Sequence, residues 1–562
     1  MFYDFSSDTN LDGLLRKARD YYGEDVNRKA SSINKDFQEA MYKRYPFDQS
    51  YNNASKYVGL RTGDFGRHTS QPSTPDPELH QNLFDSSATK YRNELAGKFF
   101  SSLFSPTKPW FNLESAMKKN KPLTSSEEKT QKEYYQKCEE IIMPLLVKHG
   151  FYPKLHSTFI EYVTFGMGVF YAQLDKKHNK LKFKSISLRN CYFETNDDEE
   201  IDTCFRIMHL RPRQVLSMFQ DSKNEALLEF LEALNDSEQY RNDLLTLVHA
   251  VRPRLKSEKS YTLLDYESCY FIHDFELFIK EEGYSDFPYF ILRWDNLPEQ
   301  IYCTGPGELA VPDARSLNQI MEHTFNNART ITAPAYVAPA DTFIGPISTA
   351  SGSVNLYDPD RGYQQKLIEP LLTGGDYNVG IDFAQHLKSS ISEKFSKNAL
   401  EEQKRAEMTA TEFSGRELDR LQELIPQYVR ILSEFGIKIV QFIYNSYETL
   451  GYLPDKPESI TSNDVNFVSE LARAQERASL ISVSSAINDL SVLANIKPEI
   501  MDSINADEYA KLILKKHDTP VELYNSEEEI NQIRSQRQQN EQQNQDIARL
   551  AELSKARGAQ PQ

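Results

Sequence analysis

Between residues 168 and 300 the chain consists of short runs of aromatic and β-branched residues. Such runs favour strands, and polar turn stretches such as 175–180 and 195–200 separate them. We expect one helix to interrupt the strands, from about Pro212 to about Leu234. The runs are VFYAQL, KFKSISL, CYFET, CFRIMHL, LLTLVHAV, CYFIHDF and YFILRW. Because most other segments have helical spacing, the block predicts an α+β fold that is predominantly helical.

The segment Leu83–Phe111 predicts an amphipathic helix that ends at a proline corner. Pro106 and Pro109 forbid further helix, and an aromatic pair, Trp110 and Phe111, follows. The apolar residues that recur at three- and four-residue steps, and so share one face, are Phe84, Ala88, Tyr91, Leu95, Phe99 and Leu103. This face is most simply a core or an interface.

Further helices are expected on both sides of this segment. Residues 11–45, 123–150 and 154–164 have helical spacing, whereas the polar residues 46–80 are typical of an extended surface arm.

The part of the chain after residue 300 predicts two more helices and a charged connection. Residues 313–330 carry Leu317, Ile320, Met321, Phe325 and Ala328 on one face. Residues 381–396 carry Phe383, Leu387, Ile391 and Phe395 at four-residue steps. A charged stretch, 397–408, leads into a long helix that we expect to kink at Pro426 and to stop at Gly451. The Gln-rich tail after residue 527 predicts a weak helix with a frayed end.

Composition excludes several classes of protein. The chain has 562 residues and a net charge of −17, which argues against a tight, sequence-reading DNA binder. Five cysteines without close spacing favour free buried thiols over disulfides or zinc. The first residues lack the features of a signal peptide, and we expect no membrane helix and no membrane partner.

The known catalytic motifs are absent from the sequence. It contains no phosphate loop, nucleophile elbow or H-E-x-x-H motif, so we expect no catalytic, cofactor-binding or metal-binding residues and no cofactor. His249 and His273 lie in strand-like runs and are expected to be ordinary core or surface histidines. The acidic group 197–200 is either a cation site or, more simply, a solvated hairpin loop.

Five blocks in collinear order resemble the podovirus portal proteins, the head-to-tail connectors of short-tailed, T7-like phages. They are LFDSSATKYRNELAGKFFSSLFSPTKPWFNL, FIEYVTFGMGVFYA, YCTGPGELAVPDARSLNQIMEHTFNNARTITAPAYVAP, MTATEFSGRELDRL and SELARAQERA. The third block has the order Thr304-Gly305-Pro306-Gly307, which departs from the family's Gly-x-Gly-Pro. The blocks span residues 83 to about 530, and the first 80 residues and the Gln-rich tail match less clearly.

The resemblance implies a structural protein, not an enzyme, that forms a ring of identical subunits, usually twelve, at one capsid vertex. Double-stranded DNA would pass through this ring during packaging and ejection. The implied partners are terminase, the major capsid and scaffolding proteins, and tail adaptor or nozzle proteins. The protein would lie in the host cytoplasm during assembly and become part of the virion, at the portal vertex of the capsid.

The resemblance also implies a portal fold with named parts. They are a wing (1–300, β-rich from about 168), a first stem helix (301–330), a clip (331–378), a second stem helix (379–396), a tunnel loop (397–409), a long wing helix (410–465) and a crown with the Gln-rich tail (466–562).

The implied tunnel loop carries charges of both signs. In a ring each charge becomes a band around the channel, so basic bands can touch phosphates while acidic bands limit the grip. The alternative is a solvated connector that needs no DNA. The candidate channel residues are Lys397, Lys404, Arg405, Glu401, Glu402 and Glu407. The candidate residues of the wing core or subunit interface are Phe84, Tyr91, Leu95, Phe99, Trp110 and Phe111.

Two other functions stay open from the residues alone. One is a different self-assembling virion protein, such as an adaptor or scaffold. The other is an enzyme whose site follows no known motif.

Overall fold

The computed structural model describes most of the chain and divides it into two compact units. Unit 1 comprises residues 1–98, 156–170 and 185–402, and unit 2 comprises 99–155, 171–184 and 403–562. The described residues are 9–66, 82–107, 109–115, 125–255, 263–295, 297–332, 336–337, 346–348, 369–370, 377–396, 424–457, 460, 463–467, 487, 490, 505, 508–510, 513 and 527–557. Together they form a mixed, mostly helical α+β protein, as the sequence predicts.

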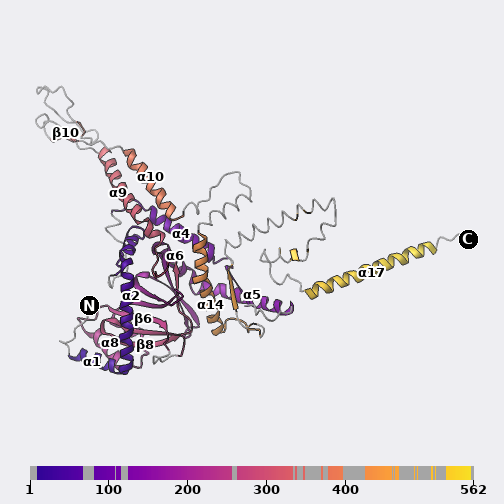
Figure 1. The fold of residues 1–562 in the computed structure, drawn as a ribbon, viewed down its shortest axis with the longest axis horizontal. Coiled ribbons are helices and arrows are strands. Elements are labelled where there is room, and N and C mark those ends of the chain that lie inside the picture. The colour runs from indigo at the N-terminus through magenta and orange to yellow at the C-terminus, as the bar shows by residue number, and fades with distance from the viewer. Residues whose placement is uncertain are drawn as a thin grey trace. The chain divides into compact units, whose positions relative to one another are not determined.

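The centre of unit 1 is a five-stranded antiparallel sheet in the order β4-β5-β6-β7-β8 (Figure 1). Its strands are β4 (Cys191–Thr195), β5 (Ile201–Leu210), β6 (Leu245–Pro253), β7 (Tyr266–Ile272) and β8 (Leu277–Tyr284). Strand β8 is absent from the runs named above, and its second half carries the polar sequence Lys280-Glu281-Glu282-Gly283. The side chain of Glu281 is nevertheless buried and pairs with Lys29 at 3.2 Å.

Helices cover both faces of this sheet. One face packs on α1 (Thr9–Asp20), α7 (Pro212–Met218) and α8 (Glu225–Asp236), through residues such as Leu15, Phe230 and Leu247. The other face packs on α2 (Gly23–Tyr57), through residues such as Phe37 and Val248. Because both faces are covered, β6 reads as a nearly continuous apolar run.

Two helix predictions in unit 1 were wrong in their extents. Residues 46–57 are not an extended arm, because α2 continues through Pro46 to Tyr57 and buries Tyr51 and Ala54 completely. The helix expected from Pro212 to Leu234 is two helices. The second of them, α8, begins after Asn224, whose side chain caps the helix by accepting a hydrogen bond from the Leu227 N–H at 3.0 Å.

The remaining elements of unit 1 include two helices that pair with each other, α9 (Pro306–Thr332) and α10 (Tyr377–Lys394). The other elements are most of α4 (Ser87–Leu103) and α6 (Phe151–Phe165), the start of β2 (Met167–Asp175), η1 (Leu188–Asn190), η2 (His273–Phe275), β9 (Tyr289–Arg293), β10 (Tyr336–Val337) and β11 (Glu369–Pro370). The short strands β10 and β11 pair antiparallel. Helix α4 starts at Ser87, after Phe84, because the Asp85 carboxylate accepts a hydrogen bond from the Ser87 N–H at 2.8 Å.

Unit 2 contains helices and two strand pairs. Its elements are β1 (Phe111–Ser115), α5 (Ser125–Lys148), the hairpin of β2 with β3 (Lys180–Ile186), α13 (Ile425–Arg430), the π-helical η4 (Ile431–Gly436), α14 (Ile437–Thr449), β12 (Asn463–Phe467) and α17 (Glu527–Arg557). Strands β1 and β12 pair antiparallel. Helix α14 is followed by Gly451 at φ 72°, as predicted. Pro426 lies in the first turn of α13, and residues 397–423 lie outside the described residues, so the predicted kink there stays a prediction. Within the described part, the helix departs from α geometry at η4.

Candidate functional site: the paired helices α9 and α10

Helices α9 and α10 form an arm of unit 1 that runs away from the sheet (Figure 1). The pair is joined at its sheet-proximal end by Asp313, whose carboxylate accepts hydrogen bonds from Lys394 Nζ and Ser390 Oγ, each at 2.6 Å. Partial burial acts to raise the pKa of Asp313, but the contacts with Lys394 and Ser390 outweigh it and the pKa is lowered. Farther along, a Cβ on Gly380 would lie 2.7 Å from Thr324 Oγ1, so glycine allows the helices to approach closely.

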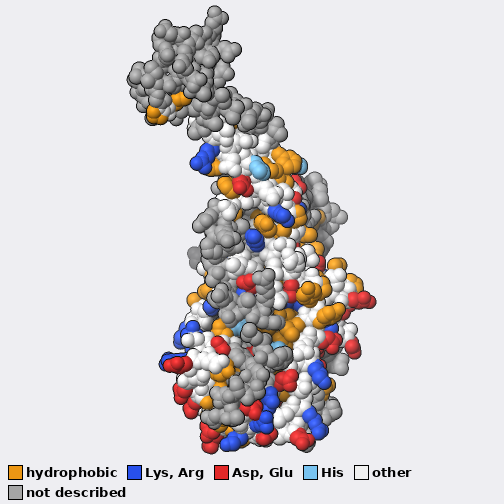
Figure 2. Space-filling view, turned by 90° about the vertical axis from the view of Figure 1, so that its left-hand side faces the viewer, with side chains coloured by type: hydrophobic (Ala, Val, Ile, Leu, Met, Phe, Trp, Pro, Cys, Tyr) orange, Lys and Arg blue, Asp and Glu red, His pale blue; other side chains and the backbone are white. Residues whose placement is uncertain are grey.

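The exposure of apolar side chains changes along the arm. Near the sheet, Leu317, Ile391 and Phe395 are almost fully buried. Farther out, Phe325 is 60% exposed and Phe383 is 52% exposed, although both belong to the apolar faces predicted from the sequence. Figure 2 shows hydrophobic side chains at the surface along this arm, among basic, acidic and His side chains. An exposed apolar surface of this kind is typical of an interaction site.

The segment before α4 fastens the arm to the rest of unit 1. Asn318 of α9 accepts a hydrogen bond from the Phe84 N–H at 2.8 Å and donates one to the Asn82 carbonyl at 3.1 Å. Asp85 pairs with Lys388 of α10 at 2.8 Å. The Phe84 ring lies 6.0 Å from that of Phe325. The same segment therefore holds both helices.

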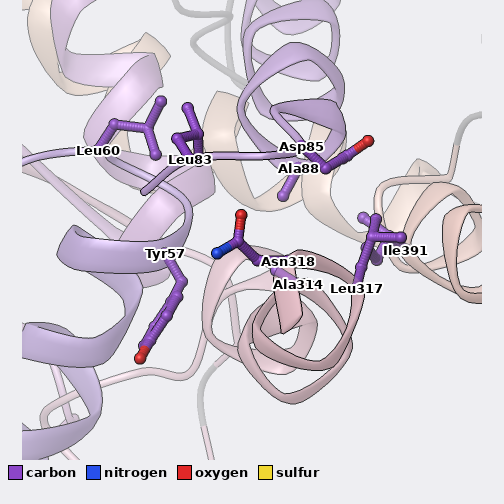
Figure 3. Close-up of a pocket in the computed structure, with 9 residues that line it drawn as sticks. All are labelled: Tyr57, Leu60, Leu83, Asp85, Ala88, Ala314, Leu317, Asn318 and Ile391. Atoms are coloured by element: carbon purple, nitrogen blue, oxygen red, sulfur yellow. The ribbon is translucent and has the colours of Figure 1, made fainter. Parts of the chain in front are cut away.

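A small hollow lies beside these contacts (Figure 3). Asn318 projects into it between its own helix and the segment that carries Leu83 and Asp85. The lining residues are Tyr57, Leu60, Leu83, Asp85, Ala88, Ala314, Leu317, Asn318 and Ile391. In this hollow the Asn318 amide is bonded on both sides and Asp85 is paired with Lys388.

At the base of the arm, two glycine motifs noted in the sequence meet. Gly166 has φ 72°, and a Cβ there would lie 2.6 Å from Gly305 N. A Cβ on Gly305 would lie 2.2 Å from Gly166 N, and one on Gly307 would lie 2.4 Å from the Thr164 carbonyl oxygen. The start of α9 therefore packs on the end of α6 backbone against backbone, which only glycine permits. The sequence showed both motifs but not that they touch.

The sequence also gave no sign of the role of Arg44. This side chain is completely buried in unit 1. Its guanidinium donates to Asp48 at 2.9 Å, to three carbonyls around η1 and β4 at 2.8–3.0 Å, and to the Tyr192 hydroxyl at 2.8 Å. It also lies 3.8 Å from the Tyr192 ring centroid. Arg44 thereby fixes α2 to the edge strand β4.

The predicted site residues fall into three groups. The channel candidates Lys397, Lys404, Arg405, Glu401, Glu402 and Glu407 lie outside the described residues. In unit 1, Leu95 is fully buried and Phe84 and Tyr91 are half-buried. In unit 2, Phe99, Trp110 and Phe111 are buried.

Trp110 belongs to an aromatic cluster in unit 2. Its indole N–H donates to the Tyr152 hydroxyl at 3.2 Å, and its ring centroid lies 4.8 Å from that of Phe104 and 4.7 Å from that of Phe111. These residues form part of the core of that unit.

The structure places the cysteines, two histidines and the acidic group named in the sequence analysis. All five cysteines are free and buried. His249 is buried between Tyr289 and Ser268, and His273 is half-buried on Asn34, as structural histidines. The acidic group 197–200 is an exposed turn, held by Asn196 Oδ1 accepting from the N–H groups of residues 198 and 200. Across the described part of the chain, no cluster of metal-ligating side chains occurs, and no helix there is long and apolar enough to span a membrane.

Comparison with known proteins gives the family. A probable portal protein of Bordetella phage BPP-1 is 24% identical over 499 residues, which cover 86% of this chain and 87% of that protein. A portal protein of Salmonella phage epsilon15 is 20% identical over 511 residues, 88% of each chain. The sequence profile of the family described as bacteriophage head to tail connecting protein matches residues 30–524. This family is structural and not enzymatic. The chain therefore belongs to the bacteriophage head to tail connecting protein family.

Proposed function

We propose that this connector assembles into a closed ring of about twelve copies at one vertex of the capsid, with a central channel for double-stranded DNA. The observation that carries the proposal is the family match over residues 30–524, which includes the whole arm. The exposed apolar residues of the arm add a physical reason for self-association. In an isolated chain, Leu309, Phe325, Ile331, Ile381 and Phe383 expose 39–60% of their surface to water. Burying them between neighbouring copies would be favourable.

Within this proposal the arm is the stem. Helix α9 (Pro306–Thr332) overlaps most of the first stem segment (301–330), and α10 (Tyr377–Lys394) overlaps most of the second (379–396). Residues 1–300 and 410–465 are assigned to the wing, 331–378 to the clip, 397–409 to the tunnel loop and 466–562 to the crown. Terminase and then tail adaptor or nozzle proteins would bind the clip, and capsid and scaffolding proteins would surround the ring.

The tunnel loop is proposed to face DNA through Lys397, Lys404 and Arg405. Each basic residue is repeated around a ring and can contact phosphates regardless of sequence. Glu401, Glu402 and Glu407 would repeat as acidic bands that weaken retention, so that DNA can slide.

Electron microscopy of the purified chain in negative stain tests the ring. We expect closed rings with a central hole. Phe325→Ser and Phe383→Ser should shift the chain toward monomers in light scattering. Leu263→Ser should not, although Leu263 is 89% exposed, because it lies outside the arm. A wild-type chain that is monomeric at all concentrations would refute the ring. Open or irregular assemblies would favour an adaptor or scaffold.

A second experiment tests the channel. Lys404→Glu with Arg405→Glu should leave ring formation intact and impair DNA packaging or retention in virions. Normal packaging by this variant would remove the tunnel assignment without affecting the ring.

A further inference from the structure

The base of the arm contains a buried carboxyl group that connects two helices. Glu308, in the first turn of α9, is only 7% exposed. One carboxyl oxygen accepts a hydrogen bond from the Gly305 N–H at 3.2 Å. The other is hydrogen-bonded by the Ser50 hydroxyl of α2. A single side chain therefore holds the start of α9 against α2.

Apart from the hydrogen bonds from Ser50 and Gly305, the surroundings of Glu308 do little to stabilise a negative charge. From α2 it faces Ser50 and Tyr51, and the Tyr51 hydroxyl donates to the Cys303 carbonyl at 3.0 Å. From the segment after β9 it faces a second acid, Asp295. The nearby cation of α2, Arg44, is engaged by Asp48 and by β4. Among the residues that the structure describes, Glu308 makes no ion pair.

The start of α9 has two different contacts. It meets α6 through the backbone of Gly305 and Gly307, which contribute no side chains. Within the described part of the chain, the hydrogen bond that joins the first turn of α9 to α2 is the one between Glu308 and Ser50.

We propose that the Glu308 carboxyl is a proton-controlled latch at the base of the arm. When protonated, it keeps the first turn of α9 closed on Ser50. When ionised, it favours opening of this turn, because the buried site gives the carboxylate two hydrogen-bond donors and no cation, whereas water solvates it fully once the turn is open. This inference concerns the single chain and does not depend on the ring.

The direction and size of the effect follow from linkage. Burial raises the pKa of Glu308 to about 7, against 4.5 for an ordinary glutamate. The hydrogen bonds from Ser50 and the Gly305 N–H oppose this rise without cancelling it, and the nearby Asp295 adds a little to it. Since the closed state has the higher pKa, its stabilisation is complete below pH 4.5 and is lost as the pH rises through 7. For these two values the equilibrium constant for opening rises roughly tenfold between pH 6 and pH 8.

Hydrogen-exchange mass spectrometry of the full purified chain tests the latch. Exchange of peptides covering residues 302–317, corrected for the intrinsic pH dependence of exchange, reports the opening of this turn. Wild-type opening should increase roughly tenfold from pH 6 to pH 8. Glu308→Gln keeps the shape of the side chain without the charge and should show the same opening at both pH values.

Two variants separate this effect from general loss of structure. Glu322→Gln, on the same helix, should retain the wild-type pH dependence. Ser50→Ala should increase opening at pH 6, where the closed pair is expected to be intact. Two results would overturn the proposal: wild-type opening that is equal at pH 6 and pH 8, or Glu308→Gln that opens with the wild-type pH dependence. If Glu308→Gln does not fold, the wild-type comparison alone decides.

Discussion

Replacing Arg44 by methionine should destabilise unit 1 far more than replacing any surface arginine. Arg44→Met keeps a long apolar side chain but removes all the hydrogen bonds to Asp48, Tyr192 and the three carbonyls. Asp48, which is only 6% exposed, is then left without its cation. Breaking a buried ion pair from one side costs about 3–5 kcal/mol. This corresponds to roughly a 150- to 5,000-fold increase in local opening.

The matched control is Arg28→Met on the same helix. Arg28 pairs with Glu24 at 3.0 Å, but both side chains are largely exposed, so the loss should be about 0.3–0.5 kcal/mol. Hydrogen exchange of peptides from residues 40–57 and 188–195 measures both variants in the full chain. An Arg44→Met cost below 1 kcal/mol, or one equal to that of Arg28→Met, would refute the assigned role.

The pH dependence of this variant gives an independent check. Burial already raises the pKa of Asp48, and Arg44 opposes that rise. Without Arg44 the pKa must rise further, so the folded variant binds a proton more readily than its unfolded chain. The stability deficit relative to wild type should therefore shrink as the pH is lowered and widen as it is raised. Arg44→Met combined with Asp48→Leu should recover part of the loss, because no buried charge is left unpaired.

Three further predictions concern other contacts. Gly305→Ala places a Cβ 2.2 Å from Gly166 N and should lower the free energy of unfolding in urea by about 2–4 kcal/mol. Gly97→Ala in α4 has open space at its Cβ and should raise that free energy by about 0.5–1 kcal/mol. Equal effects of the two variants would contradict the backbone contact. Trp110→Ala should cost about 3–5 kcal/mol in unit 2, measured by circular dichroism, and a loss below 1 kcal/mol would contradict its place in the core. Desolvation raises the pKa of Glu161 to about 7 despite the 2.8 Å hydrogen bond from the Leu188 N–H. The free energy of unfolding should therefore fall as the pH rises from 4.5 to 7, and Glu161→Gln should reduce that fall. An unchanged pH profile of stability in this variant would contradict the shift.

Strands β6 and β7 of the central sheet are predicted well from the sequence. Because both of their faces are covered, they consist mostly of apolar residues, and such runs are easy to recognise. The prediction fails at β8, where Glu281 is stabilised by Lys29, a residue far away in the chain. It also fails at Pro46, because α2 is held past the proline by the burial of Tyr51 and Ala54. In each case a long-range contact outweighs the local preference.

The candidate site shows the same limit. The spacing of Phe383, Leu387, Ile391 and Phe395 predicts a helix with one apolar face, and α10 has it. The spacing does not tell which part of that face the single chain buries. Only the structure shows that Phe395 is covered while Phe383 stays open. Arg44 resembles any helical surface charge in the sequence, since its partners on η1 and β4 follow about 150 positions later.

The glycine contact between α6 and α9 has a mechanical consequence. Side chains in a helix interface can change rotamer and absorb a displacement, but the backbones of Gly166 and Gly305 meet with no side chain between them. A push or a twist applied along α9 would therefore pass into α6 with little slack. If the arm lines a channel as proposed, such a stiff junction would carry strain in the arm directly into the helices of unit 1.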